Sequence, residues 1–235
     1  MRLLNGTPLA LALPEAFLYH GASVFTTLRA EGGRPLWLEE HLARLRRHAL
    51  ALGLSYPGDE AFLEDLEALL RAFPKAPCLR LRFTVGEGVR LSEVRPYAPL
   101  PLSLYREGGR VRLTGYRVHP DLARYKTGNY LPYRLALEEA RKEGAFEGLL
   151  LDAFGHVVDG SRTSPLLFRE GITREKVAEA ARGLGLRVER GLFRPEGLRG
   201  HLLLAGSGVG LLPVGPPPAE LLPLIERFLP ACYTE

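Results

Sequence analysis

Apolar residues recur at helical spacing in two stretches of the first half of the chain, residues 39–52 and about 59–73. In the first stretch Leu42, Leu45 and Ala49 share one face, and charged residues occupy the rest. Side chains three or four positions apart lie on the same side of an α-helix. Both stretches therefore predict amphipathic helices.

Strands are predicted around these helices. Residues 78–85 alternate apolar and basic side chains, which is the pattern of a half-exposed strand. The other candidates, in chain order, are a hairpin within residues 1–13 that turns at Asn5-Gly6, residues 23–28, and residues 35–38 after a glycine turn at 31–33.

The second half alternates short apolar runs with helical patterns. Its strand candidates are residues 110–118, 148–152, 157–159, 201–205 and 211–214, and its helix candidates are residues 129–142, 173–184 and 219–228. We therefore expect an α/β (α+β) protein with two lobes.

A proline-rich stretch at residues 96–101 interrupts these patterns and indicates a domain boundary. The predicted organisation is an N-terminal α/β domain of residues 1–100, an interdomain linker of residues 101–109 and a C-terminal domain of residues 110–235.

Composition narrows the classes of function. The chain has 235 residues, of which 46% are hydrophobic, so it can bury a real core. A formal charge of +4 without any basic tract suits small anionic ligands and argues against nucleic acid. No apolar run is long enough for a membrane span, and the first residues lack the form of a signal peptide. Arginine outnumbers lysine by 27 to four, which is typical of a thermophile or a GC-rich genome.

The two cysteines, Cys78 and Cys232, stand far apart in the sequence among apolar neighbours. No CxxC pair or metal-ligand spacing is present, so we expect two reduced thiols, a cytoplasmic protein and no metal site.

Lys126 differs from the other three lysines. Lys142 and Lys176 lie among charges on amphipathic segments, and Lys75 follows a proline. Lys126 precedes a helical pattern and has no acidic residue within four positions. A lysine that is not a surface charge can be a nucleophile, because desolvation or a nearby cation lowers its pKa. An ordinary surface lysine is the alternative.

Further candidates are ambiguous one at a time. Arg44 borders the apolar stripe of its helix and could pair with a phosphate or face solvent. Asp159 ends a short strand, where it could hold a pyridinium proton or cap a turn. The glycine-bearing turns at 171–174 and 206–208 could offer backbone amides to an anion or simply turn the chain. Thr26-Thr27 ends a predicted strand with free hydroxyls or is ordinary β-branched sequence.

The order of these motifs resembles the class-IV aminotransferase family, over nearly the whole chain. The matching segments are the opening Asn5-Gly6, the strand from Gly21 to Arg29, His41-Leu42-Ala43-Arg44-Leu45, Lys126-Thr127-Gly128-Asn129-Tyr130-Leu131, Glu147 to Asp152 with Gly155 to Val158, Gly171-Ile172-Thr173-Arg174, and Leu212-Pro213-Val214.

This resemblance implies a fold-type IV enzyme that uses pyridoxal 5′-phosphate. The expected architecture is a smaller N-terminal α/β domain and a larger, cofactor-binding C-terminal domain with a mixed, barrel-like sheet. A homodimer acting on a small molecule is also implied.

The resemblance also assigns roles to residues. Lys126 becomes the Schiff-base lysine and proton carrier, and Thr27 helps to steer the proton. The implied cofactor contacts, besides Lys126, are Arg44, Ile172, Thr173 and Ser207 at the phosphate, Asp159 at the pyridine nitrogen and Tyr130 at the phenolic oxygen. The candidates for the substrate carboxylates are Arg29, Arg80 and Arg82.

Within the family, Phe25-Thr26-Thr27 resembles the aminodeoxychorismate lyases, which convert 4-amino-4-deoxychorismate to 4-aminobenzoate and pyruvate in folate biosynthesis. Three features depart from the usual pattern: Asp159 replaces a glutamate, the connection over 161–171 is short, and Gly206 stands where the lyases often have asparagine. An aminotransferase of branched-chain or D-amino acids, and a relative that has lost its chemistry, are the alternatives.

Overall fold

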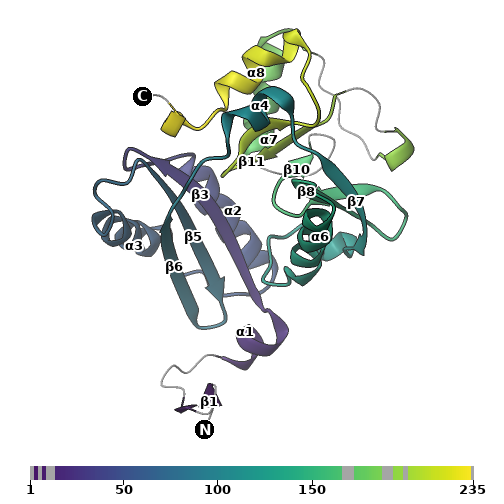
Figure 1. The fold of residues 1–235 in the computed structure, drawn as a ribbon. Helices are drawn as coiled ribbons and strands as arrows, with labels where there is room; N and C mark the ends of the chain where they lie inside the picture. Colours follow the sequence, from purple (N-terminus) through teal and green to yellow (C-terminus); the bar gives the residue numbers. More distant parts are fainter. Residues whose placement is uncertain are drawn as a thin grey trace.

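The computed structural model of the chain describes residues 3–4, 7–8, 14–165, 172–186, 193–197 and 201–233. It has the mixed α/β class expected, and its helices and strands gather in two lobes (Figure 1). The elements of the first lobe are β1 (Leu3–Leu4), β2 (Thr7–Pro8), α1 (Glu15–His20), β3 (Ser23–Glu31), β4 (Arg34–Pro35), α2 (Leu38–Ala51), α3 (Asp59–Arg71), β5 (Cys78–Gly86) and β6 (Val89–Pro96).

The first lobe is built on an antiparallel sheet in the order β4-β3-β5-β6. β3 and β5 pair along their whole length, from Ser23 opposite Gly86 to Glu31 opposite Cys78. Helices α2 and α3 pack on one face, where their apolar stripes meet alternate strand residues such as Leu28 and Phe83 in a buried core. The opposite face carries Phe25, Thr27 and Arg29, because successive side chains of a strand alternate.

The second half begins at α4 (Leu102–Glu107) and forms two three-stranded sheets. Its elements are β7 (Val111–Arg117), α5 (Pro120–Ala123), α6 (Leu131–Lys142), β8 (Glu147–Leu151), β9 (Val157–Gly160), β10 (Ser164–Pro165), α7 (Ile172–Gly183), η1 (Pro195–Gly197), β11 (Leu203–Gly206), β12 (Gly210–Pro213), η2 (Ala219–Leu221), α8 (Leu222–Arg227) and η3 (Ala231–Tyr233).

The sheet β7-β8-β9 is mixed, because β7 and β8 run parallel through the connection that holds α6, and β9 returns antiparallel. The sheet β10-β11-β12 is antiparallel and packs with α7, α4 and α8 above it in Figure 1. The expected barrel-like sheet is therefore divided into two sheets in the described part of the chain. In place of a bare linker, residues 102–107 form α4, and its Tyr105 is buried. The division into domains stays a prediction.

Most predicted elements occur within two or three residues of their expected bounds, and the differences have local causes. Strand β6 was not predicted, because it is an edge strand whose exposed, charged side chains weaken the apolar alternation. The predicted strand 35–38 shrinks to β4, since α2 already begins at Leu38. β1 and β2 pair as the predicted hairpin requires, and its Asn5-Gly6 turn lies outside the described residues. None of the described helices has the length and apolarity to cross a membrane.

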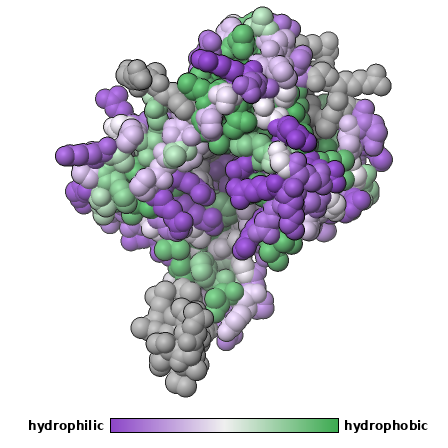
Figure 2. All heavy atoms as spheres, viewed as in Figure 1, coloured by the Kyte–Doolittle hydropathy of each residue, from purple (hydrophilic) through white to green (hydrophobic). Residues whose placement is uncertain are grey.

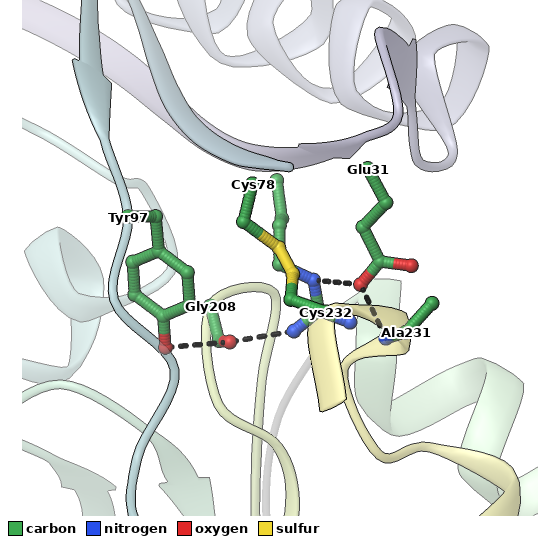
Figure 3. Close-up of a disulfide and its surroundings, with 7 residues drawn as sticks. Glu31, Cys78, Tyr97, Gly208, Ala231 and Cys232 are labelled. Atoms are coloured by element: carbon green, nitrogen blue, oxygen red, sulfur yellow. Dashed lines mark hydrogen bonds and ion pairs between the residues drawn. A yellow bond between two sulfur atoms is a disulfide. The ribbon is translucent and has the colours of Figure 1, made fainter. Parts of the chain in front are cut away.

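A disulfide between Cys78 and Cys232 corrects the expectation of two separate, reduced thiols (Figure 3). The two residues are 154 positions apart, and the bond joins the start of β5 to η3 near the end of the chain. Beside it, the Ala231 amide donates a hydrogen bond of 3.1 Å to the Glu31 carboxylate on β3. The C-terminal segment is thereby attached to the first lobe.

Candidate active site

The segment that carries Lys126 adds to the free edge of β3. The Phe25 amide donates to the Lys126 carbonyl at 2.8 Å, and the Gly128 amide donates to the Ser23 carbonyl at 2.8 Å. A Cβ at Gly128 would lie 2.4 Å from the Ser23 hydroxyl oxygen and 3.1 Å from the Gly21 carbonyl oxygen, so a larger residue would require the Ser23 side chain to move. Backbone pairing therefore places the lysine at the junction of the two lobes.

The Lys126 amine lies between two aromatic rings. Its Nζ is 3.0 Å from the Tyr130 hydroxyl and about 5 Å from the ring centres of Phe25 and Tyr130, at 5.1 and 5.2 Å. The two rings meet edge to face with centres 5.0 Å apart. The Lys126 amide also donates to Nδ1 of His48, a buried residue of α2, at 3.1 Å. The side chain is thus held by contacts from both lobes.

Burial and the positive charge of Arg44 together lower the pKa of Lys126 to about 8, against the opposing effect of Asp159. About a tenth of this amine is therefore neutral near pH 7, far more than for a solvated lysine. A neutral amine is what nucleophilic attack on a carbonyl group requires.

Asp159 supplies a carboxylate at the end of β9. Its Oδ1 accepts hydrogen bonds of 3.0 Å from the Gly160 amide and from the Ser164 hydroxyl. Burial raises the pKa of Asp159 to about 6, and the positive charge of Lys126 limits the rise. The group is therefore mostly ionised at pH 7 and suited to holding a proton on a ligand nitrogen. We call Lys126, Tyr130 and Asp159 the lysine end of the site.

Glu147 holds the turn that follows Asp159. This fully buried carboxylate accepts hydrogen bonds from the hydroxyls of Ser161 and Thr163. It also accepts hydrogen bonds from the amides of Arg162 and Thr163, at 3.1 and 2.9 Å. A buried carboxylate is stable only when it is hydrogen-bonded in this way. Glu147 therefore fixes the path of the chain directly after Asp159, a role that the sequence did not indicate.

Arg44 lies at the opposite end of the site. Its Nη2 donates to the Thr26 hydroxyl at 2.7 Å, while its buried Nε has no hydrogen-bond partner in the described part of the chain. Burial lowers the pKa of Arg44 to about 10, which still leaves it charged at pH 7. A buried guanidinium with a free N–H is costly unless an anion completes its hydrogen bonds. The residue therefore fits a phosphate.

Hydroxyl groups extend from Arg44 toward the start of α7. The Thr26 hydroxyl is 2.7 Å from Nδ1 of His41, whose Nε2 is 3.3 Å from the Ser207 hydroxyl. The Ser207 hydroxyl lies 3.3 Å from the hydroxyl of Thr173, the second residue of α7. We call Arg44, Thr26, His41, Ser207 and Thr173 the hydroxyl end of the site. Amides at the start of a helix favour an anion, as do these hydroxyl donors.

The turn that carries Ser207 is held by the first lobe. The Gly208 carbonyl accepts hydrogen bonds from Arg29 Nη1 at 2.6 Å and from the Tyr97 hydroxyl at 2.9 Å (Figure 3). Arg29 is 4% exposed and also pairs with Glu31 at 2.5 Å. These contacts occupy Arg29 and favour a role in holding the turn over the predicted contact with a substrate carboxylate.

Arg80 and Arg82 lie on the face of the first sheet opposite α2 and α3. With Glu93 and Arg95 they line a cavity of about 200 Å³. Figure 2 shows a hollow in the middle of the view, with hydrophilic side chains on both sides of it. The Arg82 guanidinium stacks 3.7 Å from the centre of the Phe25 ring, which places it one aromatic ring away from Lys126.

For three of the predicted site residues the described structure gives few contacts or none. Thr27 is opposite Arg82 in the sheet and shares its face, and no hydrogen bond of its hydroxyl is found among the described residues. Arg80 is exposed, opposite Arg29. Ile172 opens α7, and its side chain lies outside the described part.

The sequence assigned no individual role to Thr26, His41, His48 or Glu147. Two of them stood inside motifs that were noticed, Thr26 beside Thr27 and His41 three positions before Arg44. Only their burial and their partners distinguish them from ordinary strand and helix residues.

A comparison with known families matches this arrangement. Residues 23–215 match the family described as amino-transferase class IV, and the chain belongs to that family.

Individual relatives divide between two activities. A crystallised protein that carries the provisional name 4-amino-4-deoxychorismate lyase is 94% identical, with a TM-score of 0.95 and coverage of 99% of this chain and 100% of that one. The aminodeoxychorismate lyase of Bacillus subtilis (strain 168) is 28% identical over 78% of this chain and 72% of its own length. A provisionally named branched-chain-amino-acid aminotransferase of Rickettsia bellii (strain RML369-C) is 25% identical over 88% of this chain and 83% of its own.

Proposed function

We propose that this chain is a pyridoxal 5′-phosphate-dependent lyase that converts 4-amino-4-deoxychorismate to 4-aminobenzoate and pyruvate. The observation that carries the proposal is the pairing of a low-pKa amine, Lys126, with a buried carboxylate on one side and an incompletely bonded arginine, Arg44, on the other. The near-identical chain that bears the lyase name supports the choice of reaction within the family.

The residues fit the cofactor at both of its ends. At the hydroxyl end Arg44, Thr173, Ser207 and the first amides of α7, including that of Ile172, would bind the phosphate. At the lysine end Lys126 would carry the cofactor covalently, Tyr130 would meet its phenolic oxygen and Asp159 its ring nitrogen. Asp159 reaches one methylene less far than the usual glutamate, and its hydrogen bonds from Gly160 and Ser164 fix its position.

When bound, the cofactor withdraws electrons from the carbon that bears the substrate amine. Asp159 serves this by holding a proton at the ring nitrogen. The Lys126 amine, freed when the substrate binds, takes the proton from the amine-bearing carbon. The carbon–oxygen bond to the enolpyruvyl group then breaks as the substrate ring becomes aromatic. Lys126, steered by Thr27, returns the proton to the leaving group, which departs as pyruvate.

The substrate has two carboxylates, and the sheet face opposite α2 and α3 offers cations for them. Arg82 is stacked on Phe25 beside the lysine, and Arg80 lies in the same cavity. A planar guanidinium binds a carboxylate with two parallel hydrogen bonds. We assign substrate binding to these two arginines, while the contacts of Arg29 give it the task of holding the Gly208 turn.

Product stoichiometry tests the function. The two products contain all the atoms of the substrate, so the lyase needs no second substrate. Purified protein with pyridoxal 5′-phosphate should release 4-aminobenzoate and pyruvate in equal amounts from 4-amino-4-deoxychorismate without any 2-oxo acid. Cofactor binding without product release would contradict the proposal.

An aminotransferase of branched-chain or D-amino acids is the second candidate, favoured by the Rickettsia bellii relative. It would convert the bound cofactor to the pyridoxamine form when an amino acid donor is added alone, and it would require a 2-oxo acid to turn over. A protein that does not bind the cofactor would instead be an inactive relative.

A homodimer and a cytoplasmic location remain part of the proposal. The molecular mass in solution, measured by light scattering, tests the dimer, and fractionation of the source cells tests the location.

A further inference from the structure

A continuous chain of hydrogen bonds runs through the hydroxyl end and crosses between the lobes. It begins at Arg44 Nη2, passes through the hydroxyl of Thr26 and both ring nitrogens of His41, and reaches the hydroxyls of Ser207 and Thr173. Thr26 and His41 are both 0% exposed, so no solvent molecule can replace a missing partner at either. Neither residue has a role in the reaction proposed above.

The partners determine the direction of each hydrogen bond at Thr26. Arg44 can only donate, so the Thr26 oxygen accepts from it. The Thr26 proton then needs an acceptor, and the one within hydrogen-bond distance in the described structure is His41 Nδ1 at 2.7 Å. If Nδ1 carried a proton, the Thr26 oxygen would face two donors and its own buried proton would have no partner, which is costly.

His41 is therefore neutral, with its proton on Nε2. Burial and the nearby positive charges of Arg44 and Lys126 lower the pKa of His41 to about 2, which agrees with the neutral form. The Nε2–H donates to the Ser207 oxygen. Because that oxygen already accepts a hydrogen bond, the Ser207 proton is free to point away from His41, toward Thr173 or toward an anion beside it.

We propose that His41, oriented by Thr26, is a positioning residue that directs the hydroxyl protons of Ser207 and Thr173 toward the cofactor phosphate. This inference rests on the proposed function, because it concerns the same phosphate site. It adds a role for two buried residues that make no contact with the cofactor themselves. Arg44 contributes twice, through its own free N–H and through the chain that starts at its Nη2.

The tautomer can be measured on the cofactor-free protein. Nitrogen NMR of ¹⁵N-histidine-labelled protein should show His41 with a protonated Nε2 and an unprotonated Nδ1, and no titration between about pH 5 and pH 8. A Thr26→Val variant removes the hydroxyl that selects this tautomer and should give a mixture of both forms. A protonated Nδ1 in the wild type would overturn the inference before any ligand is added.

Two ligands, one with a phosphate and one without, separate the contribution of the phosphate site to affinity from that of the rest of the site. Pyridoxal and pyridoxal 5′-phosphate both react with Lys126, and only the second has a phosphate. The dissociation constant of pyridoxal divided by that of pyridoxal 5′-phosphate therefore measures how much the phosphate contributes to binding. His41→Leu should lower this ratio by about tenfold to a hundredfold, the range for hydrogen bonds to a charged group, and leave pyridoxal binding within about twofold. His41→Gln, whose amide can donate in place of Nε2–H, should recover most of the loss.

Ser207→Ala provides the matched control and covers the case in which His41→Leu does not fold. It should lower the same ratio, and adding His41→Leu to it should cause little further loss, because the two residues act through one hydrogen bond. Independent losses in the double variant would overturn the inference.

The outcomes distinguish this inference from the proposed function. A wild-type protein that binds the phosphorylated ligand tightly, with an unchanged ratio in His41→Leu, would overturn the role of His41 alone. A wild-type protein that binds pyridoxal 5′-phosphate no better than pyridoxal would overturn the phosphate site and this inference with it.

Discussion

The lysine end and the hydroxyl end of the site bind by different physical means. At the lysine end, burial lowers the pKa of Lys126 to about 8 and raises the pKa of Asp159 to about 6, so both values lie near pH 7. At the hydroxyl end, hydroxyls and a neutral His41 form a chain of hydrogen bonds that starts at one cation, Arg44. The first arrangement suits proton transfer, which needs groups that change their charge near pH 7. The second arrangement suits an anion of constant charge, which needs hydrogen-bond donors whose protonation does not change near pH 7.

The two ends also differ in their connections within the fold. Lys126 is held by backbone pairing of its own segment to β3 and by the hydrogen bond from its amide to His48 of α2. Ser207 depends on a turn whose Gly208 carbonyl is held by Arg29 and Tyr97 of the first lobe, near the disulfide (Figure 3). Both ends therefore join the two lobes, the lysine end through backbone pairing and the hydroxyl end through side chains that hold a turn.

Removing the Lys126 amine should give the largest difference between the effects on turnover, which needs the lysine end, and on cofactor binding, which the hydroxyl end supports. Lys126→Ala should lower turnover by about four orders of magnitude or more, because it removes both the nucleophile and the proton carrier. The variant should still bind pyridoxal 5′-phosphate through the hydroxyl end, without covalent attachment. Product release and the mass of the protein–cofactor species measure the two effects. Lys142→Ala, at an exposed lysine, should change neither, and a covalent species in Lys126→Ala would refute the assignment.

Asp159→Asn should lower the turnover number by about a hundredfold to a thousandfold, since the amide cannot stabilise a proton on the ring nitrogen. Cofactor affinity should change far less, because the hydroxyl end is intact. Steady-state rates and a binding titration on the same preparation report both quantities. Ser164→Ala is the matched control: it removes one hydrogen bond to Asp159 and should cost about fivefold or less. Equal losses in the two variants would argue against the assigned role of Asp159.

Opening the disulfide should weaken the attachment of the C-terminal segment. Cys232→Ser should lower the free energy of unfolding by about 2–5 kcal/mol, since the bond closes a loop of 154 residues in the unfolded chain. Denaturant unfolding with and without a reductant measures the effect. The reductant should shift the wild type and leave Cys232→Ser unchanged. A wild-type midpoint that is insensitive to reductant would show that the bond does not stabilise the fold.

Arg82 and Arg29 lie on the same face of β3 and β5 and should respond differently. Arg82→Gln should raise the KM for 4-amino-4-deoxychorismate by about tenfold, because a charged hydrogen bond to the substrate is lost. Arg29→Gln should instead lower stability, since it breaks a buried ion pair. Kinetics and thermal unfolding of both variants test the contrast. Arg71→Gln, exposed on α3 and outside the cavity that Arg82 lines, should behave as the wild type.

The smallest expected effect is a pH dependence of cofactor attachment. The neutral Lys126 amine is the reactive form, and its pKa is about 8. The rate at which pyridoxal 5′-phosphate attaches to cofactor-free protein should therefore rise with pH and level off above about pH 8, with about a tenfold loss per unit well below it. Stopped-flow absorbance follows the reaction. A midpoint near that of a solvated lysine would contradict the burial of the amine.

Much of the fold could be predicted from the sequence. The spacing of apolar residues located α2, α3 and α6 and the strands β3, β5 and β8 to within a few residues. Strand β6 and helix α4 were not predicted, because an exposed edge strand and a short helix after Pro101 show little periodicity in their apolar residues. The expected barrel-like sheet was inferred from family resemblance, and the described residues form two separate sheets.

The candidate site was partly predictable for a similar reason. Lys126 stood out because its lack of acidic neighbours is a local property of the sequence. Arg29 and Arg82 looked equivalent, since both alternate with apolar residues on predicted strands. Their different partners, Gly208 for one and the Phe25 ring for the other, come from packing between distant segments.

By itself the sequence determined most of the helices and strands, the α/β class and the lysine to test, because each depends on residues within a few positions of one another. The tertiary structure alone decided that Cys78 meets Cys232, that Arg29 holds the turn beside Ser207, and that Thr26 and His41 join Arg44 to the start of α7. Those contacts join residues as many as 179 positions apart, such as Arg29 and Gly208. They depend on how the two lobes pack, and no local spacing of side chains encodes that.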